Sequence, residues 1–329
     1  MTTKLMMAPA WSAGCNSKPP LGRVGKELYE IADQELRENE TARRECLAHL
    51  RDWIGRNPDL QNCITDDNFL LRFLRVKKFS LAMAEQTLLK YLNFRKKFKH
   101  IMFDLDYTDT KISELIDSGY IFVSPFRDCN GRRVVIYDSS KFDIQKFDGT
   151  DMSRAHAITY ETLMDDEENQ ILGVSHVGDV SAVGPSFIGL FSITEFAYLI
   201  RWGEQSFPMR HKDIHVVNIP TALKYVYDFA RSLMSQKLKE RLVVHDSLKQ
   251  LHQKVSARCL PSEFGGDMPA AEMIRLWKAE LEAKRPRLLT FDQMSLLSDR
   301  GIVRRSKPPA EDVTGSGSLP GSFRRLELD

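Results

Sequence analysis

The stretch DIHVVNIPTALKYVYDFARSLM, residues 213–234, contains the change of periodicity that decides the fold class. Its first part is a short β-branched run typical of a buried strand, and its second part carries apolar side chains at helical spacing. The same alternation continues on both sides. Strands are predicted at 132–137, 173–180 and 214–219, and helices near 151–169, 193–205, 221–234 and 235–257. Because strands alternate with helices, the sequence predicts an α/β domain with a mainly parallel sheet.

The chain upstream of this domain has only a helical pattern. Apolar spacing predicts helices at 24–37, 42–55, 66–77 and 81–98. Both ends of the chain lack periodicity and are rich in Pro, Gly and Ser, which is typical of segments that cannot build a core. We therefore expect a disordered lead-in (1–22), a small helical domain (23–100), an α/β domain (101–290) and a flexible C-terminal tail (291–329).

The composition of the 329-residue chain is that of a globular protein, with 42% hydrophobic and 28% charged residues. Its 47 basic and 45 acidic side chains leave a net charge of +2, so no overall basic field favours nucleic acid. Five scattered cysteines form no CxxC pair, which indicates a reducing compartment and argues against a zinc site. No apolar run has the length of a membrane span, and the N-terminus lacks a signal-peptide core, so a cytoplasmic location is expected.

No arrangement of residues predicts catalysis, a metal site or a cofactor. Ser186 lacks the second glycine of a nucleophile elbow, and the sequence contains no Walker-type phosphate-binding loop. His211 and His215 are four residues apart, next to and within the run at 213–219 that reads as a strand. In an extended chain this spacing corresponds to roughly 13 Å, too far for one metal ion. We therefore expect a protein that is not an enzyme and needs no cofactor or metal.

The helix predicted near 221–234 has an unusually wide apolar surface, an arc of roughly 200°. Two interpretations of this arc remain open at this point. The helix is either deeply buried, or it contacts a ligand cavity on one side and a lipid surface on the other. The apolar residues that would serve the second role are Leu223, Val226, Tyr227, Phe229, Ala230 and Leu233.

Basic side chains gather in two predicted helices. The stretch at 66–79 carries four basic side chains largely off its apolar side, Arg72, Arg75, Lys77 and Lys78. The pair Lys237 and Arg241 shares one helix face at i, i+4 spacing. Such side chains either solvate a surface helix or meet phosphate headgroups, and their spacing alone does not distinguish the two.

Five blocks of sequence, in order, carry a resemblance to a known family. The blocks are FLLRFLRVKKF (69–79), SGYIFV with RDCNGRRVVIYD (118–138), SFPMRHKDIHVVNIP (206–220), QKLKERLVVH (236–245) and LPSEFGG (260–266). Together they resemble the CRAL-TRIO lipid-binding family, in the branch of α-tocopherol transfer protein, the clavesins and cellular retinaldehyde-binding protein. The resemblance implies a helical N-terminal domain and an α/β domain whose sheet forms the floor of a closed hydrophobic pocket. It also gives the helix near 221–235 the role of a mobile gate.

The resemblance implies two sets of binding residues. The positions that match the phosphoinositide-binding patch are Lys77, Arg210, Lys212, Lys237 and Arg241. The positions that match the ligand pocket are Ser153, His156, Tyr160, Val174, Leu199, Trp202, Phe207, His211 and Ile214. This pocket is more polar than that of the tocopherol protein, and His156 and Tyr160 either bond a ligand or bond each other.

The function implied by the resemblance is that of an intracellular carrier. It would bind one small hydrophobic ligand, such as a retinoid, a tocopherol-like molecule or another lipid, and exchange it at phosphoinositide-containing membranes. The protein would be cytoplasmic, with reversible association to endosomal or other phosphoinositide-rich membranes. The alternative is a phosphoinositide-binding membrane-trafficking adaptor of the clavesin type, whose C-terminal tail recruits a protein partner.

Overall fold

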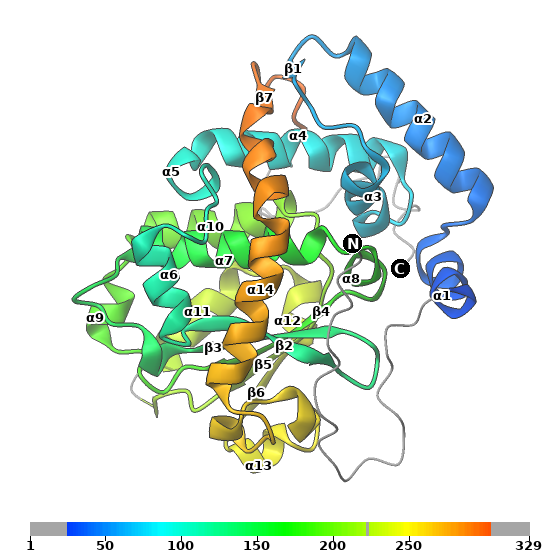
Figure 1. Ribbon diagram of the computed structural model, residues 1–329. Coiled ribbons are helices and arrows are strands. Elements are labelled where there is room, and N and C mark those ends of the chain that lie inside the picture. Colours follow the sequence, from blue (N-terminus) through cyan, green and yellow to red (C-terminus); the bar gives the residue numbers. More distant parts are fainter. Residues whose placement is uncertain (1–24, 222–223, 304–329) are drawn as a thin grey trace, which may run out of the picture.

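A computed structural model describes residues 25–221 and 224–303 of the chain, apart from the side chain of Trp202 (Figure 1). A five-stranded sheet in the order β2-β3-β4-β5-β6 lies at its centre. The first two strands are antiparallel and the other neighbours are parallel, which confirms the predicted mainly parallel α/β sheet. The strands are β2 (Ile121–Arg127), β3 (Arg133–Asp138), β4 (Val174–Asp179), β5 (His211–Val217) and β6 (Leu242–His245).

Four helices lie between residues 26 and 97, as predicted. Asn39 accepts a hydrogen bond from the backbone N–H of Ala42 at 2.9 Å, and Asp66 accepts one from Phe69 at 3.0 Å, so both side chains cap the helices that follow them. The helices are α1 (Lys26–Leu36), α2 (Glu40–Arg56), α3 (Asp67–Val76), α4 (Leu81–Lys97) and the short α5 (Lys99–Met102).

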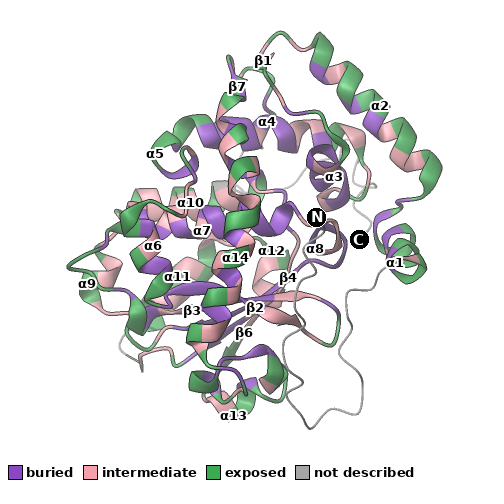
Figure 2. Cartoon of the chain, in the orientation of Figure 1, coloured by how far each residue is buried: buried purple, intermediate pink, exposed green. Residues whose placement is uncertain are grey.

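Helices of the α/β part pack around the sheet. Helix α14 runs along the molecule in front of the sheet in Figure 1 and contacts both β2 and α7. These helices are α6 (Thr110–Asp117), α7 (Gly149–Met164), α8 (Glu167–Leu172), α9 (Pro185–Ile188), α10 (Ile193–Ser206), α11 (Lys224–Leu233), α12 (Gln236–Arg241), α13 (Leu248–Leu251) and α14 (Ala270–Leu289). Buried residues, purple in Figure 2, lie along the sheet and the helices around it. One core of buried side chains extends from α2 through the sheet to α14, whereas α1 and α8 form a small separate cluster.

The prediction of one helix over 235–257 is wrong. The structure divides this range into α12, the strand β6 and α13. The strand has only four residues, LVVH, and a run this short has no periodicity that separates it from the helical patterns on either side. Strand β2 was not predicted by periodicity either, because its residues are buried over four consecutive positions instead of alternating.

The C-terminal region differs from the expected tail at 291–329. Residues 295–296 form strand β7 (Ser295–Leu296), which pairs with β1 (Leu60–Gln61) in a two-stranded antiparallel sheet. Phe291, Met294 and Leu296 are buried against the helices of the first hundred residues. The ordered chain therefore continues past residue 291, and residues 304–329 lie outside the described residues.

Two arginines of α3 are buried, so neither interpretation offered for them from the sequence is correct. Arg72 is 0% exposed and donates to Glu161 of α7 at 2.9 Å. Arg75 is 1% exposed and donates to Glu38 at 2.7 Å and to Glu167 of α8 at 2.7 Å. These ion pairs connect the N-terminal helices to the α/β part of the chain.

Candidate ligand-binding site

A cavity of about 480 Å³ lies between the sheet, α7 and α10. Its walls are mostly apolar and aromatic, and the one charged side chain among the described lining residues is Glu204. This volume and composition are typical of a site for one small hydrophobic molecule. The lining residues used below are Tyr120, Tyr137, Ser153, His156, Tyr160, His176, Leu199, Glu204, Phe207, His211, Ile214, Met234 and Leu238.

An irregularity in β5 determines which of its side chains reach the cavity. Val174 and Ser175 of β4 are consecutive, but their partners on β5 are His211 and Asp213, so β5 has one additional residue at this point. Such a bulge interrupts the alternation of side chains between the two faces of a strand. His211 and Ile214 therefore both line the cavity, although regular alternation would place them on opposite faces.

His156 of α7 is fully engaged by two tyrosines. The distance between His156 Nε2 and the hydroxyl of Tyr120 is 3.0 Å, and that between His156 Nδ1 and the hydroxyl of Tyr160 is 3.3 Å. Burial lowers the pKa of His156 to about 4, so the ring is neutral at physiological pH. Of the two alternatives left open by the sequence, the structure therefore has His156 and Tyr160 bonding each other.

A pair of histidines on the sheet also lines the cavity. His176 Nε2 of β4 and His211 Nδ1 of β5 are 2.9 Å apart, and both rings line the cavity. Burial, together with the nearby Arg241, lowers the pKa of His211 to about 4. Burial and the neighbouring histidines also hold the pKa of His176 well below its usual value. Both rings are therefore neutral.

Tyr137 of β3 contributes an aromatic wall that the sequence did not predict. It pairs with Gly178 of β4, and a Cβ atom at Gly178 would overlap the ring of Tyr137. The glycine thus makes the space that the ring occupies. His176 could have been found from its place in the predicted strand at 173–180, whereas nothing in the local sequence indicates that Tyr120 and Tyr137 face a cavity.

Most of the pocket residues implied by the resemblance line this cavity. Ser153, His156, Tyr160, Leu199, Phe207, His211 and Ile214 all do so. Val174 does not: it lies at the start of β4, is 1% exposed and packs in the core. The side chain of Trp202 lies outside the described residues.

The gate helix is placed differently from the expectation. Helix α11 packs against α10, and α10 supplies the wall of the cavity on this side through Leu199, Glu204 and others. None of the described residues of α11 lines the cavity, and none is buried. Contact with the cavity comes from Met234, directly after the helix, and Leu238 of α12. Leu223 lies outside the described residues.

The apolar side chains of α11 are instead partly exposed. Tyr225 is 68% exposed and Phe229 is 39% exposed, while Val226, Tyr227, Ala230 and Leu233 are of intermediate exposure. The backbone N–H of Ser235, which follows α11, donates to Glu204 at 3.0 Å, so the end of this segment is fixed to α10. The interpretation of a deeply buried helix is therefore wrong.

Four of the five predicted phosphoinositide-binding residues form one basic cluster at the start of β5 and on α12: Arg210, Lys212, Lys237 and Arg241. Burial and the charges of Arg241, Lys78 and Arg210 lower the pKa of Lys237. Burial and the charge of Arg210 lower the pKa of Lys212, although its bond to Glu35 opposes this. Lys77, the fifth predicted residue, directly follows the last residue of α3. Its neighbour Lys78 was not among the predicted phosphoinositide-binding residues.

The basic cluster and the cavity share a short backbone segment. His211 points into the cavity, whereas its two neighbours in sequence, Arg210 and Lys212, bond Glu35 of α1 at 2.8 and 3.0 Å. Arg241 also donates a hydrogen bond to the backbone carbonyl of His211. A headgroup held by these cations would therefore lie one residue away from the cavity wall.

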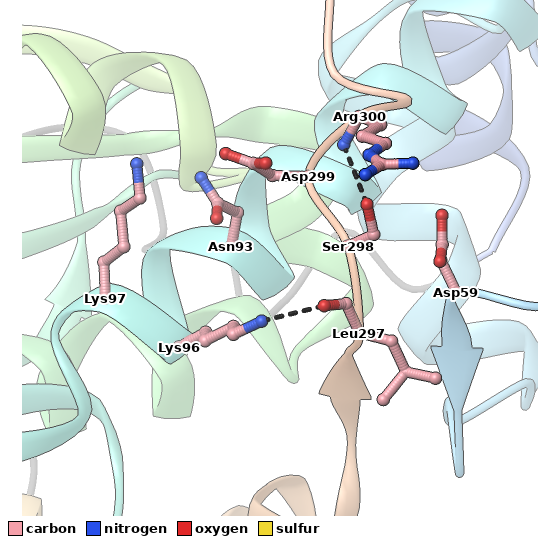
Figure 3. Close-up of a pocket in the computed structure, with 8 residues that line it drawn as sticks. All are labelled: Asp59, Asn93, Lys96, Lys97, Leu297, Ser298, Asp299 and Arg300. Carbon is pink, nitrogen blue, oxygen red and sulfur yellow. Dashed lines mark hydrogen bonds between the residues drawn. The ribbon is translucent and has the colours of Figure 1, made fainter.

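A second hollow, between the end of α4 and the segment after β7, has a different character (Figure 3). Seven of its eight lining side chains are polar or charged, among them the acidic Asp59 and Asp299 and the basic Lys96, Lys97 and Arg300. Lys96 donates to the carbonyls of Leu296 and Leu297 at 3.0 Å, as Figure 3 shows for Leu297. Mixed charge and a lack of apolar walls do not suit a lipid.

Within residues 25–221 and 224–303, no group of three or more acidic, His or Cys side chains could hold a metal ion. In the same part of the chain, no helix combines the length and the apolar character needed to cross a bilayer.

Comparison with known proteins identifies the family that this cavity and sheet define. Residues 117–266 match the model of the CRAL/TRIO domain, and residues 39–112 match that of the Pinta-like UBA domain. The chain belongs to the CRAL-TRIO lipid-binding family, as the sequence predicted.

The clavesins are among its relatives. Clavesin-1 of Pongo abelii is 31% identical over 251 residues, which cover 76% of this chain and 71% of that protein. Clavesin-2 of Homo sapiens is 29% identical over 251 residues, which cover 76% of this chain and 77% of that protein. Among solved structures, that of Sfh5 shares the fold, with a TM-score of 0.51, 15% identity, and coverage of 77% of this chain and 99% of that one.

Proposed function

We propose that this protein is an intracellular carrier that binds one small hydrophobic ligand and exchanges it at membranes that contain phosphoinositides. The observation that supports this most directly is the apolar cavity of about 480 Å³ with a basic cluster one residue from its wall. Burial of a lipid in such a cavity contributes roughly 25 cal/mol per Å² of apolar surface, which favours retention. No bond of the ligand is made or broken.

Release requires a signal from the membrane, because a ligand held by burial leaves only when a conformation of the protein with an open cavity becomes favoured. Anionic headgroups on Arg210, Lys212, Lys237 and Arg241 would supply this signal. Arg241 bonds the carbonyl of His211, so a headgroup that draws Arg241 away would loosen the strand that carries a cavity side chain. The exposed aromatic rings of α11, Tyr225 and Phe229, suit insertion into the interface of the same membrane.

The first test is native mass spectrometry with lipid extraction of the purified protein, with one lipophilic molecule per chain expected. The second measures delivery of a bound fluorescent lipid to vesicles with and without phosphatidylinositol bisphosphate. Replacing the four cations by Gln removes their charge but keeps an amide donor, because Arg210 and Arg241 also bond backbone carbonyls. We expect retention to be unchanged and delivery to phosphoinositide vesicles to slow at least about tenfold.

A matched variant controls for the loss of four positive charges. It carries Gln at the four exposed cations Arg44, Arg56, Lys249 and Arg275, which lie on other helices. This control should deliver lipid at the rate of the unmodified protein. Equal delivery by the cluster variant and the control would overturn the membrane mechanism, and a protein that retains no lipophile from any source would overturn the carrier itself.

A further inference from the structure

Two histidines of the sheet present ring nitrogens to the cavity that are not used by other described side chains. His156 uses both ring nitrogens on Tyr120 and Tyr160. Ser153 donates to the carbonyl of Gly149 at 2.8 Å, one turn earlier in α7. Within the described part of the chain, the nitrogens His176 Nδ1 and His211 Nε2 make no hydrogen bond, although both rings line the cavity. Among the described residues, these two nitrogens and the hydroxyl of Tyr137 on β3 are therefore available to a polar group on a bound lipid.

The chemistry of two neutral imidazoles that bond each other determines which hydrogen-bonding groups the pair His176 and His211 leaves for a ligand. A neutral imidazole has one N–H donor and one acceptor nitrogen. The bond between His176 Nε2 and His211 Nδ1 uses one donor and one acceptor, whichever ring donates. The two remaining nitrogens are then one donor and one acceptor. A hydroxyl group both donates and accepts, so it can bond either nitrogen, whereas a carbonyl only accepts and can bond only the one that donates.

The same wall is unsuited to an anionic lipid. The described lining residues include no Lys or Arg, and their one charged side chain is the carboxylate of Glu204. Burial without a counter-charge keeps the histidine rings neutral, so they do not compensate a carboxylate or phosphate. An unpaired charge in an apolar cavity carries a large desolvation cost.

We propose that His176 and His211 determine ligand specificity by selecting an uncharged lipid that carries a hydroxyl group. This inference rests on the proposed function, because it concerns the ligand of the same cavity. His176 and His211 lie on adjacent strands of the sheet, so their rings are held in place by the sheet register. The hydroxyl lies at the pair, and the apolar part of the lipid extends along α7 and α10.

The experiment compares three probes of equal chain length, octadecanol, octadecane and stearate, in displacement of a fluorescent lipid from the full-length protein at pH 7.5. We expect octadecanol to bind at least about tenfold more tightly than octadecane, and stearate to bind most weakly. Replacing both histidines by Phe should remove the advantage of octadecanol and leave the affinity for octadecane unchanged. Unchanged octadecane binding also shows that the variant is folded.

The chain contains a matched control pair. His215 Nδ1 and His245 Nε2 are also 2.9 Å apart on adjacent strands, but neither residue lines the cavity. Phe at these two positions should leave the octadecanol preference intact. Equal affinity for octadecanol and octadecane in the unmodified protein, or a preference that survives His176→Phe with His211→Phe, would overturn the inference. Failure of all three probes and of extracted lipids to bind would instead contradict the proposed carrier function.

Discussion

A buried ion pair connects helix α3 of the N-terminal part to helix α7 of the α/β part. Glu161 of α7 accepts from Arg72 at 2.9 Å and from the hydroxyl of Tyr91 at 2.8 Å, and the side chains of Glu161 and Arg72 are both 0% exposed. The Arg72 guanidinium also lies over the rings of Phe69 and Phe291, at 4.9 and 5.4 Å. Such a pair contributes little net stability against an apolar alternative, but loss of one partner is severe.

Glu161→Gln should therefore destabilise the protein by about 3 kcal/mol or more, because it leaves Arg72 buried beside only the more distant Asp165, at 3.7 Å. The measurement is the free energy of unfolding from urea denaturation. The control is Glu272→Gln, which removes an exposed i, i+3 pair with Arg275 and should cause no measurable change. A Glu161→Gln protein as stable as the control would show that Arg72 gains another partner or water.

At the scale of single elements, the short helix α1 covers part of the basic cluster. It packs through Leu28, Ala32 and Leu36 on Ile171 and Leu172, apart from the main core. Its Glu35 accepts from both Arg210 and Lys212. Burial raises the pKa of Glu35, but these two bonds lower it by more, so the carboxylate is charged and competes with any anionic headgroup.

Glu35→Gln should consequently increase the affinity for vesicles containing phosphatidylinositol bisphosphate. The expected gain is about twofold to fivefold, since the Glu35 side chain is 46% exposed and pairs of this kind contribute at most about 1 kcal/mol. Vesicle co-sedimentation at fixed ionic strength measures it. The control is Glu30→Gln, on the same helix, whose ion pair is with the exposed Lys26, and it should bind as the unmodified protein does. Equal binding by the two variants would mean that Glu35 does not compete.

The elements also show where sequence patterns are informative. The four N-terminal helices and strands β3, β4 and β5 were predicted close to their observed positions, because each has several residues in one period. Strand β6, which divides the helix predicted at 235–257, was missed because its four residues are too few to define a period. The exposed apolar side chains of α11 show that a wide apolar arc does not distinguish burial from a surface that awaits a partner.

At the scale of the whole molecule, residues 291–296 pack against the N-terminal helices and pair with β1. Phe291 is 0% exposed and lies 5.7 Å from the ring of Phe69, and Leu296 pairs with Leu60 across the small sheet. Arg95 donates to Asp292 at 2.7 Å. These contacts join residues that are 197 to 236 positions apart in the sequence.

Ending the chain at residue 290 should cost at least about 5 kcal/mol of stability relative to a chain that ends at 303. The shorter chain loses the buried side chains of Phe291, Met294, Leu296 and Ile302, and each such loss typically costs 2–5 kcal/mol. Thermal and urea unfolding of the two truncated proteins compares them directly. If they unfold with the same midpoint, residues 291–303 do not contribute to the folded state.

The sequence by itself determined the fold class through its periodicity, and the family through its motifs. Seven of the residues that line the cavity followed from the family resemblance. The tertiary structure alone decided three features that depend on distant neighbours. A bulge in β5 turns His211 into the cavity beside His176. Carboxylates of α7 and α8 pair with the buried Arg72 and Arg75. Glu35 of α1 pairs with Arg210 and Lys212. Each partner lies more than thirty residues away, and no local pattern encodes such a contact.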